Sequence, residues 1–225
     1  MTRVVKAPDV RRSEILDVAR GFFYQKGYEQ TSIQDIIAEI GIAKGTFYHY
    51  FGSKLDLLDA IIAQMMAHIL QQLQPLVADE QLSALEKFNQ YFATAERWKV
   101  ENKAFFLGIV RIWYSDDNAI FRDKTKAASL QGVLPELAKI IELGIAEGAF
   151  VASDPLEIAE IVMGISHNFS ETIGRLLLQA ADGEISLSLV EKKVAAAQYA
   201  IERVLNAPPG SINLFDMDRT RQWFG

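Results

Sequence analysis

The fold of this chain is decided by residues 31–54, which read TSIQDIIAEIGIAKGTFYHYFGSK. Thr31 and Ser32 are candidate N-caps, and Gln34 is a possible capping-box partner for Thr31. The isoleucines that follow recur at helical spacing and predict a short helix with one apolar face: Ile33, Ile36, Ile37 and Ile40. Gly41 breaks this helix, and another short helix is expected from about residue 43 to 51. Two short helices joined by a glycine-containing turn are typical of a helix-turn-helix, whose second helix can enter the major groove of DNA.

The second of these helices has two different faces. Phe47 and Phe51 are four residues apart and share a face that can pack on the preceding helices, on Ile36, Ile40 and Phe22. Lys44 and Tyr48 lie about 100° round the helix, flanked by Gly45 and His49. Glycine costs a helix about 1 kcal/mol relative to alanine, so Gly45 is best explained if a phosphate or a base edge must come close. The side chains on this face that can donate hydrogen bonds to DNA are those of Lys44, Thr46, Tyr48 and His49.

Lys54 directly follows Ser53, a candidate cap of the next helix. The dipole at that end of a helix disfavours a cation, whereas its free N–H groups suit an anion. A phosphate lying between them would explain the lysine. An ordinary solvated lysine explains it equally well.

Working outward, the rest of the chain also reads as helices, with no convincing alternating strand. A first helix is expected from about residue 11 to 26, ended by Gly27, and a long fourth helix from Ser53 to about Gln74, before Pro75. Further helices are expected at about 80–98, 102–114, 117–148, 154–181 and 185–206, and Gly132 with Pro135 divides or kinks the third of these. The fold class is therefore all-α: an N-terminal three-helix DNA-binding domain at residues 1–52 and a larger helical domain at residues 53–225.

The composition limits the class of protein. Half of the 225 residues are hydrophobic, there is no cysteine, and the net charge is −6. Residues 1–54 carry eight Lys or Arg and six Asp or Glu, so a head of charge +2 precedes a body of charge −8, as expected for a DNA-binding module on a domain that does not bind DNA. No apolar run approaches the roughly 20 residues that span a bilayer, and nothing marks the chain for export, so we expect a cytoplasmic protein without membrane contact.

An enzyme is the first alternative. The three histidines, His49, His68 and His167, lie in separate regions and form no metal-binding pair at helical spacing. The sequence also lacks a nucleophile elbow, a phosphate-binding loop and a dinucleotide fingerprint. We therefore expect no enzymatic activity, no cofactor and no metal site. The second alternative is a helical dimer that has lost DNA binding, but such a protein would have no reason to keep Lys44, Gly45, Tyr48 and Lys54 together.

The segment from Gly41 to Leu58, with its lead-in from Gly27 to Ile37, closely resembles the signature of the TetR family of transcriptional regulators. The resemblance covers about residues 11–60. It implies a homodimer that binds a palindromic double-stranded operator, most often as a repressor, and is released by a small-molecule effector. It also implies that residues 53–225 form a ligand-binding and dimerisation domain. By matched position, phosphate contacts fall to Thr31, Tyr48, Tyr50 and Lys54, and the residues nearest base edges are Lys44, Gly45, Thr46 and His49. Ala43 stands where many relatives have serine, and Arg3, Lys6, Arg11 and Arg12 could add contacts to the backbone or minor groove.

The body has no motif of its own. Apolar stripes run along 154–181 (Ile158, Val162, Ile165, Phe169, Ile173) and 185–206 (Leu187, Val190, Val194, Ala197, Ile201, Val204). The resemblance suggests that these two helices pair with their copies as a four-helix bundle; the alternative is that both stripes face the chain's own core. An aromatic middle section with a few polar groups suits a ligand pocket, and we predict that Trp113, Tyr114 and His167 contribute to a site for a hydrophobic or amphipathic effector.

Overall fold

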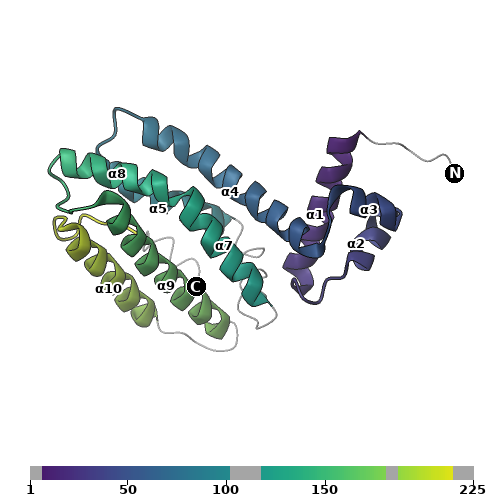
Figure 1. Cartoon of the computed structure of the whole chain (residues 1–225). Helices are drawn as coiled ribbons and strands as arrows, with labels where there is room; N and C mark the ends of the chain where they lie inside the picture. The colour runs from purple at the N-terminus through teal and green to yellow at the C-terminus, as the bar shows by residue number, and fades with distance from the viewer. Residues whose placement is uncertain (1–6, 102–117, 181–186, 215–225) are drawn as a thin grey trace. The chain divides into compact units, whose positions relative to one another are not determined.

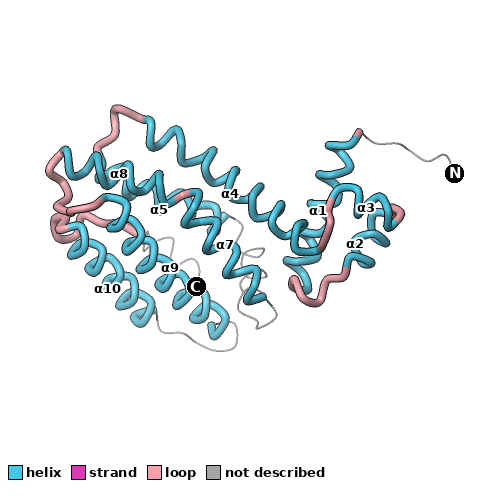
Figure 2. The backbone as a smooth tube through the Cα atoms, viewed as in Figure 1, coloured by secondary structure: helices cyan, strands magenta, loops and turns pink. Residues whose placement is uncertain are grey.

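The computed structural model describes residues 7–101, 118–180 and 187–214. These ranges contain nine helices and no strand, which confirms the all-α prediction for the described part of the chain (Figures 1 and 2). The helices are α1 (Pro8–Lys26), α2 (Ile33–Ile40), α3 (Lys44–Tyr50), α4 (Lys54–Ala78), α5 (Ala84–Glu101), α7 (Ala119–Gly132), α8 (Leu134–Ala146), α9 (Pro155–Ala180) and α10 (Leu187–Leu205).

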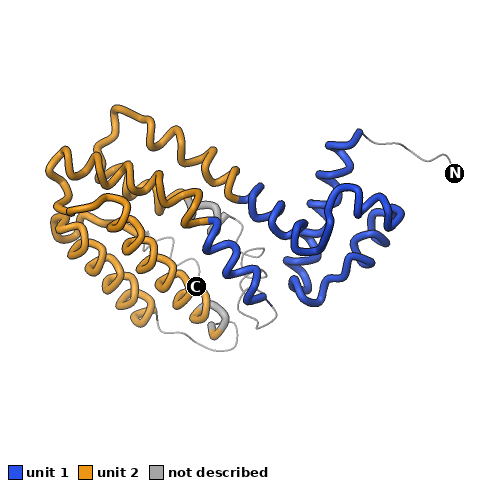
Figure 3. Tube along the Cα trace, viewed as in Figure 1, with its two compact units in different colours: residues 1–65, 108–128 blue, residues 66–107, 129–225 orange. Residues whose placement is uncertain are grey.

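The chain divides into two compact units, coloured separately in Figure 3. Unit 1 comprises residues 1–65 and 108–128, and unit 2 comprises residues 66–107 and 129–225. The helices α4 and α7 are each continuous and contribute residues to both units. The unit that contains the helix-turn-helix therefore includes a second stretch of chain far away in the sequence.

Unit 1 has its own core. Residues from four helices are almost fully buried in it: Ile15, Leu16, Ala19 and Phe23 of α1, Ile36 and Ile37 of α2, Phe47 of α3, and Leu57, Leu58, Ile61 and Ile62 of α4. Helix α1 begins three residues earlier than predicted, because Pro8 occupies its first turn and Asp9 favours the positive end of the helix dipole. Helix α4 ends a turn later than predicted and includes Pro75.

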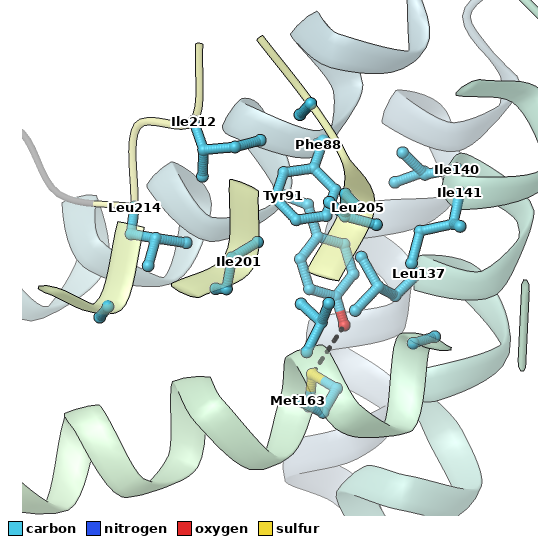
Figure 4. Close-up of a cluster of buried hydrophobic side chains, with 14 of the residues drawn as sticks. Phe88, Tyr91, Leu137, Ile140, Ile141, Met163, Ile201, Leu205, Ile212 and Leu214 are labelled. Atoms are coloured by element: carbon cyan, nitrogen blue, oxygen red, sulfur yellow. Dashed lines mark hydrogen bonds between the residues drawn. The ribbon is translucent and has the colours of Figure 1, made fainter. Parts of the chain in front are cut away.

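The core of unit 2 lies between helices α5, α8, α9 and α10, where α8 packs on α5 and α9, and α9 packs on α10. Figure 4 shows part of this core, in which Phe88 and Tyr91 of α5 lie beside Leu137, Ile140 and Ile141 of α8. The segment 117–148 forms two helices that meet at Val133, as Gly132 and Pro135 suggested. No helix within the described ranges is long and apolar enough to cross a membrane.

The two apolar stripes predicted to form a dimer seam instead face this core. Val162 of α9 and Val190, Val194 and Ile201 of α10 are at most 2% exposed within a single chain, and Ile158, Ile165 and Ile173 pack against the same cluster. The alternative reading of these stripes is therefore correct. Any contact between copies through α9 and α10 must use the opposite faces of these helices.

The segment that follows α10 packs onto unit 2. Ile212 and Leu214 are at most 2% exposed and belong to the core cluster. The side-chain amide of Asn89 donates to the Ser211 carbonyl (2.9 Å) and accepts from the Asn213 N–H (2.8 Å). Residues 207–214 are thus held by side chains from α5, although Ala207-Pro-Pro-Gly210 ends the helix. Trp223 and Phe224 lie outside the described residues.

Candidate functional site

The position of α3 is set by the ends of α2. Ser32 is the N-cap of α2: its hydroxyl accepts from the Asp35 N–H (3.1 Å), and the Asp35 carboxylate accepts from the Ser32 N–H (2.9 Å). The capping box therefore pairs Ser32 with Asp35, not Thr31 with Gln34 as predicted. At the other end Gly41 adopts the left-handed conformation (φ +71°, ψ 36°), which glycine tolerates without strain. This conformation ends α2 and directs the chain into α3.

The two faces of α3 differ as the sequence predicted. Phe47 and Phe51 are at most 4% exposed, with ring centroids 6.0 Å apart. On the opposite side Lys44, Gly45, Tyr48 and His49 are exposed, and Tyr48 retains 46% of its surface. Thr46 and Tyr50 are partly exposed. We refer to Lys44, Gly45, Thr46, Tyr48, His49 and Tyr50 together as the outer face of α3.

The side chains of the outer face support one another. The Lys44 ammonium lies 5.8 Å from the centroid of the Tyr48 ring, and the Tyr48 ring meets the buried Phe47 ring edge-on at 5.4 Å. The His49 and Tyr50 rings are also edge-on, with centroids 5.0 Å apart. A short helix thus presents an ammonium, two phenol hydroxyls, an imidazole and a threonine hydroxyl, all of which can donate hydrogen bonds to phosphates or base edges.

Gly45 is not required by the packing of the described residues. Its backbone is in an ordinary helical conformation, and a Cβ placed on it would meet nothing within 4 Å among those residues. Neither φ nor close packing therefore demands a glycine there. The close approach of a phosphate or a base edge, expected from the sequence, stays a prediction.

Two predicted contact residues lie differently. Thr31 is 1% exposed, and its hydroxyl donates to the Gly27 carbonyl (2.8 Å) at the turn between α1 and α2. The Lys54 ammonium donates to the carbonyls of Tyr28 (3.0 Å) and Glu29 (3.5 Å) and lies 4.2 Å from the centroid of the Tyr28 ring. These carbonyls already explain a lysine at the start of α4, so its position is no longer an independent sign of a phosphate. DNA contacts by Thr31 and Lys54 stay predictions.

Arg11 and Arg12 of α1, which could add contacts to DNA, have different neighbours. Arg11 pairs with Glu14 at 2.5 Å, one turn further along the helix. Arg12 is exposed, and its guanidinium carbon lies 5.2 Å from the centroid of the Phe51 ring at the end of α3. Arg12 is therefore the better-placed member of the pair for a contact beside α3. Arg3 and Lys6 lie outside the described residues.

The titratable groups of unit 1 reflect this packing. Hydrogen bonds from the Lys26 ammonium and then from Ser32 lower the pKa of the Asp35 carboxyl to about 2. Burial, followed by the nearby carboxylates of Glu29 and Asp59, raises the pKa of the Tyr28 phenol. Asp35 therefore caps α2 as a carboxylate at neutral pH, and Tyr28 stays neutral.

The predicted ligand residues are less well defined. Trp113 and Tyr114 lie outside the described residues. His167 is half-buried on α9, one turn after Met163, whose sulfur lies 3.9 Å from the Tyr91 hydroxyl. Tyr91 also donates to the Val133 carbonyl (3.2 Å), and burial followed by the Glu136 carboxylate raises the pKa of its phenol. Asn168, the polar residue that follows His167 on α9, is exposed.

Residues 15–61 match the model of the bacterial regulatory proteins of the tetR family, and residues 110–189 match that of the tetracyclin repressor-like C-terminal domain. The chain belongs to the TetR family of transcriptional regulators. The resemblance inferred from residues 11–60 is thereby confirmed, and the second match extends it into the body.

Among curated TetR-type relatives, the HTH-type transcriptional repressor KstR2 of Mycobacterium tuberculosis is 29% identical over 92 residues, which are 41% of this chain and 46% of that protein. The regulator YvdT of Bacillus subtilis is 41% identical over 61 residues, 27% of this chain and 31% of that protein. The matched segments thus span less than half the length of these relatives. The regulator YfiR of Bacillus subtilis is 23% identical over 184 residues, 80% of this chain and 81% of that protein.

Solved TetR-family structures extend the likeness to the whole fold. A regulator from Pectobacterium atrosepticum superposes with a TM-score of 0.61 at 23% identity, covering 89% of this chain and 96% of that one. A regulator from Agrobacterium tumefaciens gives a TM-score of 0.60 at 21% identity, covering 88% and 100%. The predicted architecture, an N-terminal helix-turn-helix domain followed by a helical C-terminal domain, is the architecture of this family.

Proposed function

We propose that this TetR-family protein is a repressor that binds a palindromic operator as a homodimer and is released by a small-molecule effector. The observation that carries the proposal is the outer face of α3, where Gly45 and exposed hydrogen-bond donors occupy one side of a short helix whose other side is buried. The relative KstR2 is a transcriptional repressor, which supports repression as the sign of regulation. Because the target is the operator DNA of a bacterial-type regulator, the proposal places the protein in the cytoplasm.

The roles on DNA follow from the chemistry of each side chain. Lys44, Thr46 and His49 would reach base edges, and Gly45 would let the helix backbone approach them. Tyr48 and Tyr50 would donate their hydroxyls to phosphates and fix the register of the helix in the groove. Thr31 and Lys54 stabilise the turn between α1 and α2, and any contact they make to phosphate would be additional to that role.

The homodimer is proposed to form through the outward faces of α9 and α10. Apolar side chains are exposed on both helices: Leu156 (48%), Ile161 (51%), Leu189 (41%) and Tyr199 (63%). Gly164 on α9 and Ala196 on α10 are exposed small residues that permit close approach of a second helix. Ile161→Glu should therefore convert a dimer to a monomer in sedimentation velocity, whereas Val151→Glu, at an apolar position 64% exposed outside these helices, should leave the dimer intact.

The effector is proposed to release the DNA by changing the distance between the two α3 helices of the dimer, which are its recognition helices. These must lie about 34 Å apart, or a multiple of that, to enter successive major grooves on one side of the DNA. An effector that binds one separation better than the other shifts the population and lowers operator affinity. Trp113, Tyr114 and His167 remain the predicted contributors to a site for a hydrophobic or amphipathic effector, and His167→Ala tests the described member by loss of effector affinity in calorimetry.

The experiment for operator binding is selection from a random duplex DNA library with the full-length protein. We expect a palindromic sequence to be enriched and to bind with a Kd of about 10⁻⁸ M or tighter at stated salt. Tyr48→Ala and Lys44→Gln should weaken that binding, whereas Lys126→Gln, at an exposed lysine on α7, should not. Tyr48 and Lys44 are better test positions than Lys54, whose loss would also disturb the turn. No enrichment, with only weak binding that is equal on unrelated DNA and unchanged in the variants, would favour a helical dimer without a DNA target.

A further inference from the structure

Tyr28 is the residue on which three parts of unit 1 meet. Its carbonyl accepts from the Lys54 ammonium (3.0 Å) and from the Thr31 N–H (3.2 Å), which join the start of α4 to the turn before α2. Its ring is 6% exposed and lies edge-on to the Phe23 ring of α1, with centroids 5.2 Å apart. The position of Tyr28 therefore fixes how α1, α2 and α4 are arranged around the helix-turn-helix.

The backbone N–H of Tyr28 is bound by a residue 90 positions away. It donates to the side-chain carbonyl Oδ1 of Asn118 at 2.8 Å. Asn118 is 3% exposed and directly precedes α7. A buried backbone N–H requires an acceptor, and here no neighbouring backbone in the turn supplies it; the acceptor comes from the Asn118 side chain.

A second contact ties α7 to α4. The Lys124 ammonium of α7 lies 2.6 Å from the Asp59 carboxylate of α4, within unit 1. Asn118 and Lys124 thus fasten the first turns of α7 to residues on either side of the helix-turn-helix. Because α7 continues as one helix to Gly132, which belongs to unit 2, it is a second continuous connection between the units beside α4.

We propose that Asn118 is a positioning residue for DNA binding: through the Tyr28 N–H it holds the turn between α1 and α2, and so couples α7 to the orientation of α3. The proposal rests on operator binding as proposed above. It adds a route by which a change in the body reaches the recognition helix.

The test compares Asn118→Ala with Asn118→Ser and with Asn89→Ala in the full-length protein. Asn118→Ala removes the acceptor. Asn118→Ser supplies a hydroxyl oxygen that can accept from the Tyr28 N–H, and it perturbs the fold less than Asn118→Ala does. Asn89→Ala is the matched control, because Asn89 also binds the backbone of a distant segment, at Ser211 and Asn213, but within unit 2. Two quantities are measured: hydrogen exchange of the Tyr28 amide, and affinity for the selected operator.

We expect Asn118→Ala to speed exchange of the Tyr28 amide and weaken operator binding by about ten-fold, the effect of losing one buried hydrogen bond. Asn118→Ser should lie between this variant and the unchanged protein in both quantities. Asn89→Ala should lower the melting temperature without changing the Kd for the operator. Faster Tyr28 exchange with unchanged operator affinity would overturn the positioning role, as would an equal loss of affinity in Asn89→Ala. If the unchanged protein enriches no DNA sequence, operator binding itself fails, and Tyr28 exchange still decides separately whether Asn118 holds the turn.

Discussion

Replacing Gly45 with alanine separates stability from DNA binding at a single position. Gly45 lies in α3 in an ordinary helical conformation, is exposed, and would place an added Cβ in open space within the chain. The substitution therefore introduces no clash in the free protein. It removes the conformational freedom of glycine from the unfolded state, which favours the folded one.

The two effects of the methyl group have opposite signs. Glycine inside a helix costs about 0.5–1 kcal/mol relative to alanine, so Gly45→Ala should raise the free energy of unfolding by up to that amount. For a chain of this size the melting temperature should then rise by about 1–4 °C. If DNA approaches the Gly45 backbone closely, a methyl group there costs about 1–3 kcal/mol of overpacking, or about a 5- to 150-fold loss of operator affinity.

The assay is thermal unfolding together with fluorescence anisotropy on the selected operator at fixed salt. Gly21→Ala is the matched control, because Gly21 lies in α1, in the same unit, and an added Cβ there also meets nothing within 4 Å. It should stabilise the protein to a similar extent and leave operator affinity unchanged. Gly45→Ala with unchanged operator affinity would show that no partner approaches this glycine, and the explanation of the outer face of α3 would be wrong.

Three further predictions concern the folded chain. Gly144→Ala should lower the free energy of unfolding by about 1–3 kcal/mol in urea denaturation, because the added Cβ would collide with the Phe150 ring; unchanged stability would mean that the ring moves aside. Asp35→Asn should destabilise the protein at pH 7, and this effect should shrink as the pH falls from about 4 towards 2. Because the folded-state pKa of Asp35 is lowered to about 2, its contribution is present above the unfolded-state pKa of about 4 and is lost as the pH falls through 2; a difference as large at pH 2 as at pH 7 would contradict this reasoning. Ile212→Ala should cost about 2–5 kcal/mol, since this side chain is 1% exposed in the core of unit 2; a cost near zero would show that residues 207–214 are not held to the core.

The helix-turn-helix was predictable because its signals are local. The spacing of Ile33, Ile36 and Ile37 and the left-handed Gly41 place α2, and the four-residue separation of Phe47 and Phe51 identifies the buried side of α3. The bounds of α3 differ from the prediction by a single residue at each end. The capping box was wrong by one position, because Thr31 and Ser32 are adjacent hydroxyl residues and the sequence alone does not say which of them begins the helix.

Contacts between distant segments were not predictable. Lys54 was interpreted through the dipole of its own helix, whereas its partners are the carbonyls of Tyr28 and Glu29, which lie on another part of the chain. Asn118 has no periodic or motif signal, although its side chain binds the turn that positions α2. A single asparagine at the start of a predicted helix gives no sign of the backbone group that it will bind.

The body shows a different limit. The stripes on α9 and α10 were found at the right positions, but their partner was wrong, because periodicity reports that a face is buried and not what buries it. The exposed Ile161 and Tyr199 break the expected polar pattern on the opposite faces of the same helices. These exposed apolar residues are the sequence signal of a second face on α9 and α10, opposite the face that is buried in the core of unit 2.

The charge distribution predicts how strongly operator binding depends on salt. The local balance of the head is only +2, and Tyr48, Thr46 and His49 can donate hydrogen bonds without adding counterion release when uncharged. Lys44 on α3 and Arg12 beside Phe51 are the cations that the described contacts place at this face. Lys44 would displace counterions from the groove beside the base edges, and Arg12 would displace them from the backbone. With about two such cations per head and two heads per dimer, the slope of log K against log salt should be about −4. Lys44→Gln should make it shallower by about 2, one unit for each head of the dimer. A slope steeper than about −7 would require further cations, and Arg3 and Lys6 of the N-terminal arm would then be the residues to replace.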